Sequence, residues 1–355
     1  MQTKKKGLDM IMNSRERVLN AIAGKKVDRP AVQYAYFGPG YFEHGEKLND
    51  LYEKYLGDFC AFVRQPIPKL PPENFDPDGR YHVVAKDDWG ATYEYRVFGM
   101  MGHAMDFPIK SKEDMAAYNF PPLPAYTKDS EALESLKAHF SAVKKDYLVM
   151  AGAGGSYLER MSAIRGFENF LMDLYEDSGE INDFMDRLTD YYLENILAQI
   201  KAGAEGFSFG DDYGTQNGLI MSKEMFGHAI KPRLKRLTDP IKRAGLHIHF
   251  HSCGKVLELF EDFRDIGVDS VWLQMPVYDM DELCDACREY GFASALHPDR
   301  AFTMTHGSPG DVKELVLKIN ETFKPKDGGS WFYIEADTGF PFENIKALVE
   351  TVYSI

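Results

Sequence analysis

The chain has 355 residues, of which 44% are hydrophobic and 27% are charged, so it can bury a sizeable core and is not expected to be disordered. Its formal net charge is −14. We therefore expect no nucleic-acid partner, because binding to nucleic acids depends on Lys and Arg side chains that neutralise phosphates. An acidic chain of this kind is typical of a cytoplasmic protein.

Neither a membrane anchor nor a secreted location is expected from the sequence. No run of about 18 apolar residues occurs in the chain. The basic start, MQTKKKGLDMIMNSRERVLNAI, is not followed by an apolar segment with a cleavage site, so we do not expect a signal peptide. The four cysteines are too few for a disulfide framework, and we expect them to be reduced and free for metal binding or catalysis.

The N-terminal part of the chain, residues 1–28, is expected to be a helical extension. Residues 14–23 have the spacing of a short amphipathic helix, with Ser14 as its cap. Gly24 follows the last apolar position and is expected to end this helix.

Two strands and a hairpin are predicted in the first third of the chain. An apolar run after Pro30 predicts the first strand, and the run that begins at Ala61 predicts a second strand before it enters a proline-rich segment. The sequence YHVVAKDDWGATYEYRVFG alternates around a Trp-Gly turn. We expect a β-hairpin there, from about Asp87 to Tyr95.

The rest of the chain alternates between strand and helix patterns. Six short apolar runs are each followed by a helical pattern, and they begin at Tyr147, Gly206, His247, Ser270, Ala293 and Trp331. Such alternation implies parallel strands joined by right-handed crossovers. With the two earlier strands the count is eight, which predicts a (β/α)8 TIM barrel formed by residues 1–355 as a single domain. All six runs end in small, polar or ionisable residues, which favours a barrel, because barrel enzymes build their site from many strand ends.

The run HIHFHSCGK, which begins at His247, carries the most specific chemical pattern. Side chains alternate faces along a strand, so His251 and Cys253 share one face and lie last, at the mouth of the predicted barrel. An imidazole and a thiolate in that position are within reach of one zinc ion, and Gly254 lets the chain turn away directly behind them. Two ligands do not hold zinc, and the pattern is equally compatible with core histidines and a buried thiol.

A third ligand has to come from another strand end. Glu335 is the best candidate because it lies at the end of the last predicted strand, and Asp337 is the second choice on the same face. The C-x-x-C pair of Cys284 and Cys287 lies in a predicted helix, without the context of a redox motif and without a second C-x-x-C. We interpret that pair as structural.

Several segments resemble the uroporphyrinogen decarboxylase-like superfamily, in the same order along the chain and from about Ser14 to the C-terminus. They are SRERVLNAIAGKKVDRPAV, GDDYGTQNGLIMSKEMFGHAIKPRLKRL, HFHSCGKVLELFEDFRDIGVDSVWLQMP and GFPFENIKAL. The resemblance implies one (β/α)8 barrel with additional N-terminal helices.

Within this superfamily, the residues resemble the cobalamin-dependent methyltransferases more than the decarboxylases. The decarboxylases carry R-Q-A-G-R after the first strand, and the corresponding stretch here, VQYAYFGPGYF, has no arginine. In the thiol-methylating members, H-x-C-G supplies two zinc ligands, and a cysteine before a P-x-E-N-[IL] segment supplies the third. His251 and Cys253 match the first element, PFENI matches the second, and Glu335 takes the place of the cysteine. A carboxylate ligand favours a zinc ion that polarises an ether oxygen.

The resemblance thus implies a zinc-dependent transfer of a methyl group between a small methylated substrate, with a methoxylated compound favoured, and a corrinoid protein. The cobalamin is expected on that partner, because the chain lacks a D-x-H-x-x-G pattern. The alternatives are a decarboxylase of a small acid or porphyrinogen-like substrate, and a non-catalytic barrel that binds a corrinoid protein.

Further candidate site residues belong to two groups, one that could orient the leaving group or supply its proton and one that could bind the substrate. The first group is Asp211, Asp212 and Tyr213, and the second is Tyr36, Phe37, His297 and Arg300. A loop cap is the structural alternative for the first group, and core packing is the alternative for the two aromatic residues.

Overall fold

The computed structural model describes residues 11–355, so the first ten residues of the predicted extension lie outside the described residues. The strands are β1 (Val32–Ala35), β2 (Val83–Lys86), β3 (Thr92–Tyr95), β4 (His103–Asp106), β5 (Met150–Gly152), β6 (Gly206–Gly210), β7 (His247–Ser252), β8 (Ser270–Leu273), β9 (Ala293–Leu296) and β10 (Ser330–Glu335). The helices are α1 (Ser14–Ile22), α2 (Gly38–His44), α3 (Glu46–Lys54), α4 (Lys112–Ala117), α5 (Ser130–Val143), α6 (Leu158–Arg165), α7 (Phe167–Glu176), α8 (Gly179–Ala202), α9 (Lys223–Met225), α10 (Lys231–Arg243), α11 (Phe260–Asp265), α12 (Met280–Tyr290), α13 (Thr303–His306), α14 (Pro309–Phe323) and α15 (Phe342–Ser354).

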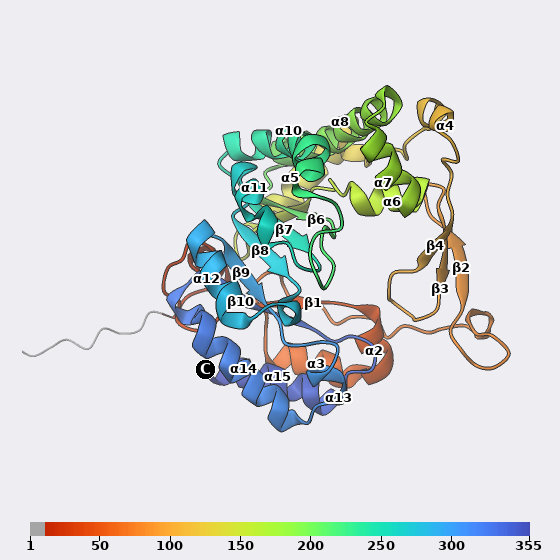
Figure 1. Cartoon of the computed structure of the whole chain (residues 1–355). Coiled ribbons are helices and arrows are strands. Elements are labelled where there is room, and N and C mark those ends of the chain that lie inside the picture. Colours follow the sequence, from red (N-terminus) through yellow and green to blue (C-terminus); the bar gives the residue numbers. More distant parts are fainter. Residues whose placement is uncertain (1–10) are drawn as a thin grey trace, which may run out of the picture.

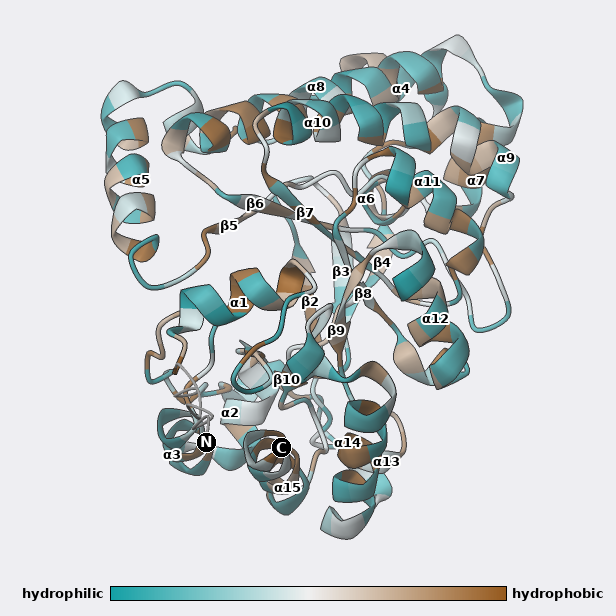
Figure 2. Cartoon of the chain, turned by 90° about the vertical axis from the view of Figure 1, so that its left-hand side faces the viewer, coloured by the Kyte–Doolittle hydropathy of each residue, from teal (hydrophilic) through white to brown (hydrophobic). Residues whose placement is uncertain are grey.

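Seven parallel strands form the central sheet, in the order β1-β10-β9-β8-β7-β6-β5. All six runs that predicted barrel strands in the second part of the chain are strands of this sheet, and so is the run after Pro30. The helices between them cover the outer face of the sheet (Figure 1). Figure 2 shows these helices banded in both colours, as expected for helices with one apolar face and one solvated face.

The prediction of a closed eight-stranded barrel is wrong. The segment from Ala61, predicted as a strand, has no regular secondary structure, and within the described residues β1 and β5 do not pair with each other. Pro66 and Pro68 lie in this segment, and proline cannot donate a backbone hydrogen bond to a neighbouring strand. The seven strands therefore form a curved, open half-barrel with a gap between its first and last strands.

The strands alternate their side chains between two environments, as the sequence pattern predicts. On β7, Ile248 and Phe250 are buried against the outer helices, whereas His247, His249 and His251 are partly accessible on the inner face. Apart from the main apolar core, a smaller apolar cluster fills part of the interior and includes the indoles of Trp272 and Trp331. This alternation positions the inward-facing side chains at the carboxyl ends of the strands, where they meet at one mouth.

The predicted hairpin forms, and a third strand extends it. β2 and β3 pair antiparallel, and β4 pairs with the other edge of β3. Strand β4 was not predicted from the sequence. This small sheet stands at one side of the molecule and contacts α6 through β4 (Figure 1).

The N-terminal helix forms as predicted, with a different cap. Asn13, one residue earlier than the predicted cap, accepts a hydrogen bond from the backbone N–H of Glu16, and the Glu16 side chain accepts the reciprocal bond. Ser14 donates its hydroxyl to the buried carboxylate of Asp58 instead. Within residues 11–355, no helix combines the length and the apolar character that crossing a bilayer requires.

Candidate metal centre

Three potential ligand atoms meet at the mouth of the half-barrel. His251 is near the end of β7, Cys253 follows it, and Asp212 follows β6. The Nε2 atom of His251 lies 3.6 Å from the Sγ atom of Cys253 and 3.4 Å from Oδ1 of Asp212. All three ligand atoms lie within 4.8 Å of one another. The structure thus brings together the His251–Cys253 pair expected from the sequence and adds the carboxylate of Asp212.

Backbone contacts hold this group in place. The backbone N–H of Cys253 donates to Oδ1 of Asp212 over 2.7 Å. Behind the pair, Gly254 has a φ of +72°, and a Cβ atom there would overlap the backbone of Gly214 in the loop after β6. The two loops therefore cross backbone to backbone, which requires glycine at this point and keeps Asp212 beside Cys253.

The ring of His251 stacks on the indole of Trp272, with ring centroids 4.3 Å apart. Trp272 also stacks with His297, at 4.4 Å between centroids. The stacking on Trp272 restricts the orientation of the His251 imidazole. A ligand that is oriented before the metal arrives loses less conformational freedom when the metal binds.

Burial and the contacts among the three side chains shift the pKa values of Asp212 and Cys253. Burial opposes ionisation of Asp212, but His251 and the backbone N–H of Cys253 outweigh this effect, and the net pKa of Asp212 is lowered. Burial, together with Asp212, raises the pKa of the Cys253 thiol to about 12. Without a cation, Cys253 is therefore a neutral thiol at physiological pH. A metal that binds here has to displace its proton.

The donor set fits zinc. Ligands at about 2.0–2.3 Å from a tetrahedral zinc ion lie about 3.3–3.8 Å from one another, which is the range of the His251 contacts. One sulfur, one nitrogen and one oxygen are all zinc ligands, and three protein ligands leave a fourth position for substrate or water. The residues present therefore fit a catalytic zinc site.

Glu335, the expected third ligand, lies elsewhere in the mouth. It is 4% exposed, and its Oε1 atom lies 3.0 Å from the guanidinium of Arg300, which also lies over the ring of Trp272. Burial raises the pKa of Glu335, and Arg300 opposes that shift. Asp337 accepts a hydrogen bond from the backbone N–H of Thr338. Neither carboxylate belongs to the group of three ligand atoms.

Asp211 and Tyr213 do not face the mouth as the catalytic interpretation requires. Asp211 accepts hydrogen bonds from the backbone N–H groups of Tyr157, Leu158 and Glu159 at 2.7–2.9 Å, so it caps the start of α6. Tyr213 is fully buried, and its ring packs against aromatic side chains behind the sheet. The structure therefore supports the loop-cap alternative for Asp211 and a core role for Tyr213.

Most of the residues expected to bind substrate contact other groups of the protein instead. His297 is 1% exposed, both its ring nitrogens contact backbone carbonyls, and burial lowers its pKa to about 4. Arg300 is paired with Glu335. Tyr36 packs edge-on against Tyr52, which agrees with the core-packing alternative, and Phe37 is exposed before α2. None of the four lines the cavity beside the metal group.

A cavity of about 460 Å³ opens beside the metal group, and Asp212 is part of its wall. Its other walls come from β3, β4 and α6, and they include Glu159 in the first turn of α6. Glu159 was not predicted as a site residue. The sequence feature that could have identified it is its position shortly after the glycine-rich end of β5.

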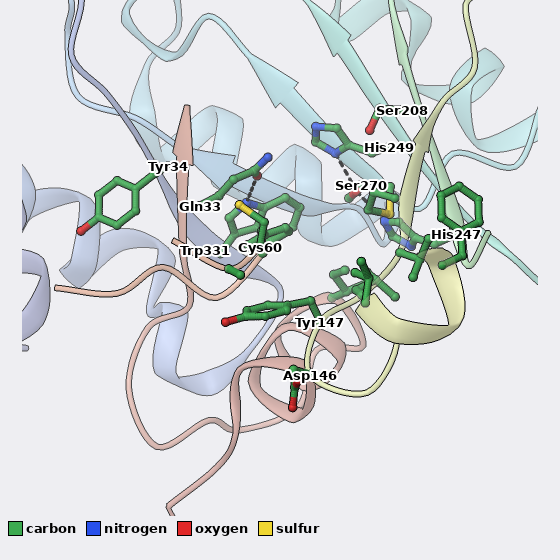
Figure 3. A pocket seen from close by; sticks show the side chains of 18 of the residues that line it. Gln33, Tyr34, Cys60, Asp146, Tyr147, Ser208, His247, His249, Ser270 and Trp331 are labelled. Carbon is green, nitrogen blue, oxygen red and sulfur yellow. Dashed lines mark hydrogen bonds between the residues drawn. The ribbon is translucent and has the colours of Figure 1, made fainter. Parts of the chain in front are cut away.

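A second, larger cavity of about 730 Å³ lies in the gap between β1 and β5 (Figure 3). Its polar lining includes His247 and His249, which both contact the hydroxyl of Ser270 at 2.8 Å. Burial lowers the pKa of His247 to about 4 and that of His249 to about 3. Both imidazoles are therefore neutral at physiological pH, and we interpret them as the polar floor of the half-barrel.

The sequence matches the family model of uroporphyrinogen decarboxylase (URO-D) over residues 99–355. The chain belongs to the URO-D family. Two relatives described as uroporphyrinogen decarboxylase have similar coverage. The protein from Vibrio campbellii is 25% identical over 279 residues, which is 74% of each chain. A protein from Bacillus cereus is 24% identical over 277 residues, which is 74% of this chain and 76% of that one.

A solved structure shares the fold over nearly the whole chain. The structure of a methyltransferase from Methanosarcina mazei superposes with a TM-score of 0.64 and covers 97% of this chain and 99% of that one. The sequence identity is 15%, so the likeness establishes a common fold. The match to the family model confirms the family predicted from the sequence segments.

Proposed function

We propose that this URO-D family member is a zinc-dependent methyltransferase that moves a methyl group between a small methylated substrate and a corrinoid protein. The observation that carries the proposal is the group of Asp212, His251 and Cys253 at the mouth of the half-barrel. A methoxylated compound is the favoured substrate. Its ether oxygen is a hard donor that suits a zinc ion held partly by a carboxylate.

Bound zinc would act as a Lewis acid that stabilises the negative charge on the oxygen from which the methyl group leaves. The residues of this chain supply the remaining functions. His251 and Cys253 would hold the ion from the end of β7, and Asp212 would hold it from the neighbouring strand end. Trp272 fixes the imidazole plane, and the crossing of Gly254 with the loop after β6 keeps the three ligands together.

The comparisons are compatible with either of two chemistries. The Methanosarcina mazei protein with the same fold is called a methyltransferase, whereas the curated relatives are called decarboxylases. A substrate with several carboxylates needs free cations in the site. In this chain the stretch after β1 has no arginine, and Arg300 is paired with Glu335. These features support the methyltransferase over the decarboxylase.

A coupled assay tests the proposal. Zinc-loaded protein is mixed with a corrinoid protein in its Co(I) state and with a panel of methoxylated aromatic compounds, and release of the demethylated product is measured. We expect transfer by the parent protein and by Cys60→Ser, and a loss of at least about 100-fold in Cys253→Ser. Carbon dioxide release from carboxylated substrates without any methyl transfer would favour the decarboxylase. Tight corrinoid-protein binding without turnover would favour the non-catalytic alternative.

A further inference from the structure

The 460 Å³ cavity beside Asp212 has the form of a substrate pocket. The small sheet closes one side of it and α6 closes the other. Its apolar walls are formed by Tyr93, Met101, Phe107, Leu158, Phe167 and Ile220. A cavity of this size, mostly apolar with a few polar groups, is typical of small-molecule sites.

The charged groups of the cavity argue against an anionic ligand. Besides Asp212, the ionisable side chains among its described lining residues are Tyr93, His103, Glu159 and Arg160. Arg160 lies 3.2 Å from the carboxylate of Asp87, and its guanidinium lies 4.3 Å from the centre of the Trp89 ring. Its charge is thus already balanced, and the pocket offers no free arginine for a substrate carboxylate.

Glu159 is held at the wall of this pocket. Its backbone N–H donates to Oδ1 of Asp211, and the hydroxyl of Ser156 lies within 3.4 Å of its Oε2 atom. The same hydroxyl donates to Asp211 over 3.0 Å. The cap of α6 therefore anchors Glu159 on the same side of the mouth as Asp212, and its carboxyl group borders the space in which a metal-bound substrate would lie.

We propose that this pocket binds the uncharged body of a methyl ether and that Glu159 donates the proton to the leaving oxygen. The inference rests on the proposed function. In the step, the bond between the methyl carbon and oxygen breaks and its electron pair stays on the oxygen. The methyl carbon forms its new bond with the electron pair of the nucleophile that the corrinoid protein supplies. The proton of Glu159 moves to the oxygen, and solvent later replaces it.

The electrostatic surroundings support a protonated Glu159. Burial in the pocket, with the carboxylates of Asp211 and Asp212, raises its pKa to about 7, against the opposing effect of His251. A general acid is most effective when its pKa lies near the working pH. The titratable and charged groups that face or flank Glu159 are Asp211, Asp212, Tyr213, His251, Cys253, Tyr93, His103 and Arg160.

Calorimetric titration of the metal-free protein with anisole tests the assignment without methyl transfer and without coordination of the ether oxygen by zinc. The ether oxygen of anisole only accepts hydrogen bonds, so it binds best when Glu159 carries its proton. We expect the affinity of the parent protein to fall about fivefold or more between about pH 6 and about pH 8. Glu159→Gln, which donates at every pH, should show no such fall. Benzene, which has no oxygen, should bind independently of pH in both proteins.

Two variants that fill the pocket locate the binding. Ala163→Phe on α6 and Ile220→Trp on the loop after β6 should each weaken binding of anisole and benzene by at least about tenfold. Anisole binding that both folded variants retain would overturn the location. A pH dependence that persists in Glu159→Gln, or that is absent from the parent, would overturn the role of Glu159. If anisole binds with the expected pattern but the coupled assay shows no methyl transfer, the proposed function is wrong and the assignment of the ether pocket is retained.

Discussion

Asp212 contacts both other members of the candidate metal centre, through His251 Nε2 and through the backbone N–H of Cys253. Glu335 has a different partner, because its carboxylate lies against Arg300. The two acidic residues both lie at strand ends, and their contacts assign them different roles. We propose Asp212 as a metal ligand, whereas Glu335 is the partner of the half-buried Arg300.

Exchange of each carboxylate for its amide separates these roles. We expect Asp212→Asn to lower the zinc affinity by at least about tenfold, because it removes a charged ligand. Glu335→Gln should keep the zinc content of the parent and should not lower the free energy of unfolding, because burial raises the pKa of Glu335 despite Arg300, so the folded protein disfavours the charged carboxylate. Metal content by mass spectrometry and denaturant unfolding provide the two measurements. The reverse pattern would show that the third ligand comes from β10.

The identity of the third ligand illustrates what the sequence does not determine. Alternation along a strand is a local property, so the pairing of His251 with Cys253 follows from the sequence. The carboxylate that reaches them depends on how the loop after β6 crosses the loop after β7 at Gly254, which is a tertiary contact. For the same reason Glu159 could not be predicted, because its position depends on how Asp211, at the end of β6, caps α6.

An ion pair connects helix α1 to the segment before β1. Arg17 binds Asp28 through two hydrogen bonds, of 2.7 and 2.8 Å, and Asp28 also accepts from the backbone N–H of Met12. Burial opposes ionisation of Asp28, but these partners outweigh it and lower its pKa to about 2. The pair therefore makes the docking of α1 dependent on pH.

The sign of this dependence follows from the lowered pKa. Because the folded carboxyl group has a lower pKa than the unfolded one, it stabilises the fold above about pH 4, by about 2 kcal/mol at most. This contribution is lost as the pH falls from about 4 to about 2. We expect Asp28→Asn to be less stable than the parent at neutral pH, and the difference to shrink over that acid range. Unfolding curves at several pH values measure it, and a constant difference would contradict the assignment.

The predicted elements agree with the structure wherever the chain repeats one local pattern. The six runs from Tyr147 onward became strands of one sheet because each couples an apolar strand to a helix. The run from Ala61 has apolar residues as well, but its prolines prevent regular pairing. The strand β4 was missed because its sequence, HAMD, has a weak alternation that only pairing with β3 reveals.

At the scale of the whole molecule, the gap between β1 and β5 exposes the inner face of the sheet. Cys60 is exposed and lines the cavity in this gap, whereas Cys284 and Cys287 are buried in α12, in agreement with their structural interpretation (Figure 3). A closed eight-stranded barrel would pair the segment around Cys60 with both neighbours.

Thiol labelling distinguishes the open form from a closed barrel. We expect a maleimide to modify Cys60 in the native protein well before Cys284 and Cys287, which should react only after unfolding. Peptide mass spectrometry locates the label, and Cys60→Ser serves as the control. Protection of Cys60 to the level of Cys284 would indicate that an eighth strand closes the barrel in solution.

Zinc K-edge X-ray absorption of the purified, zinc-loaded protein measures the ligands of the metal. We expect stoichiometric zinc with one sulfur ligand at about 2.3 Å and nitrogen or oxygen ligands at about 2.0–2.2 Å. The sulfur should disappear in Cys253→Ser and remain in Cys60→Ser. A coordination shell without sulfur in the parent protein, or a protein that takes up no stoichiometric zinc, would show that Asp212, His251 and Cys253 do not form a zinc site.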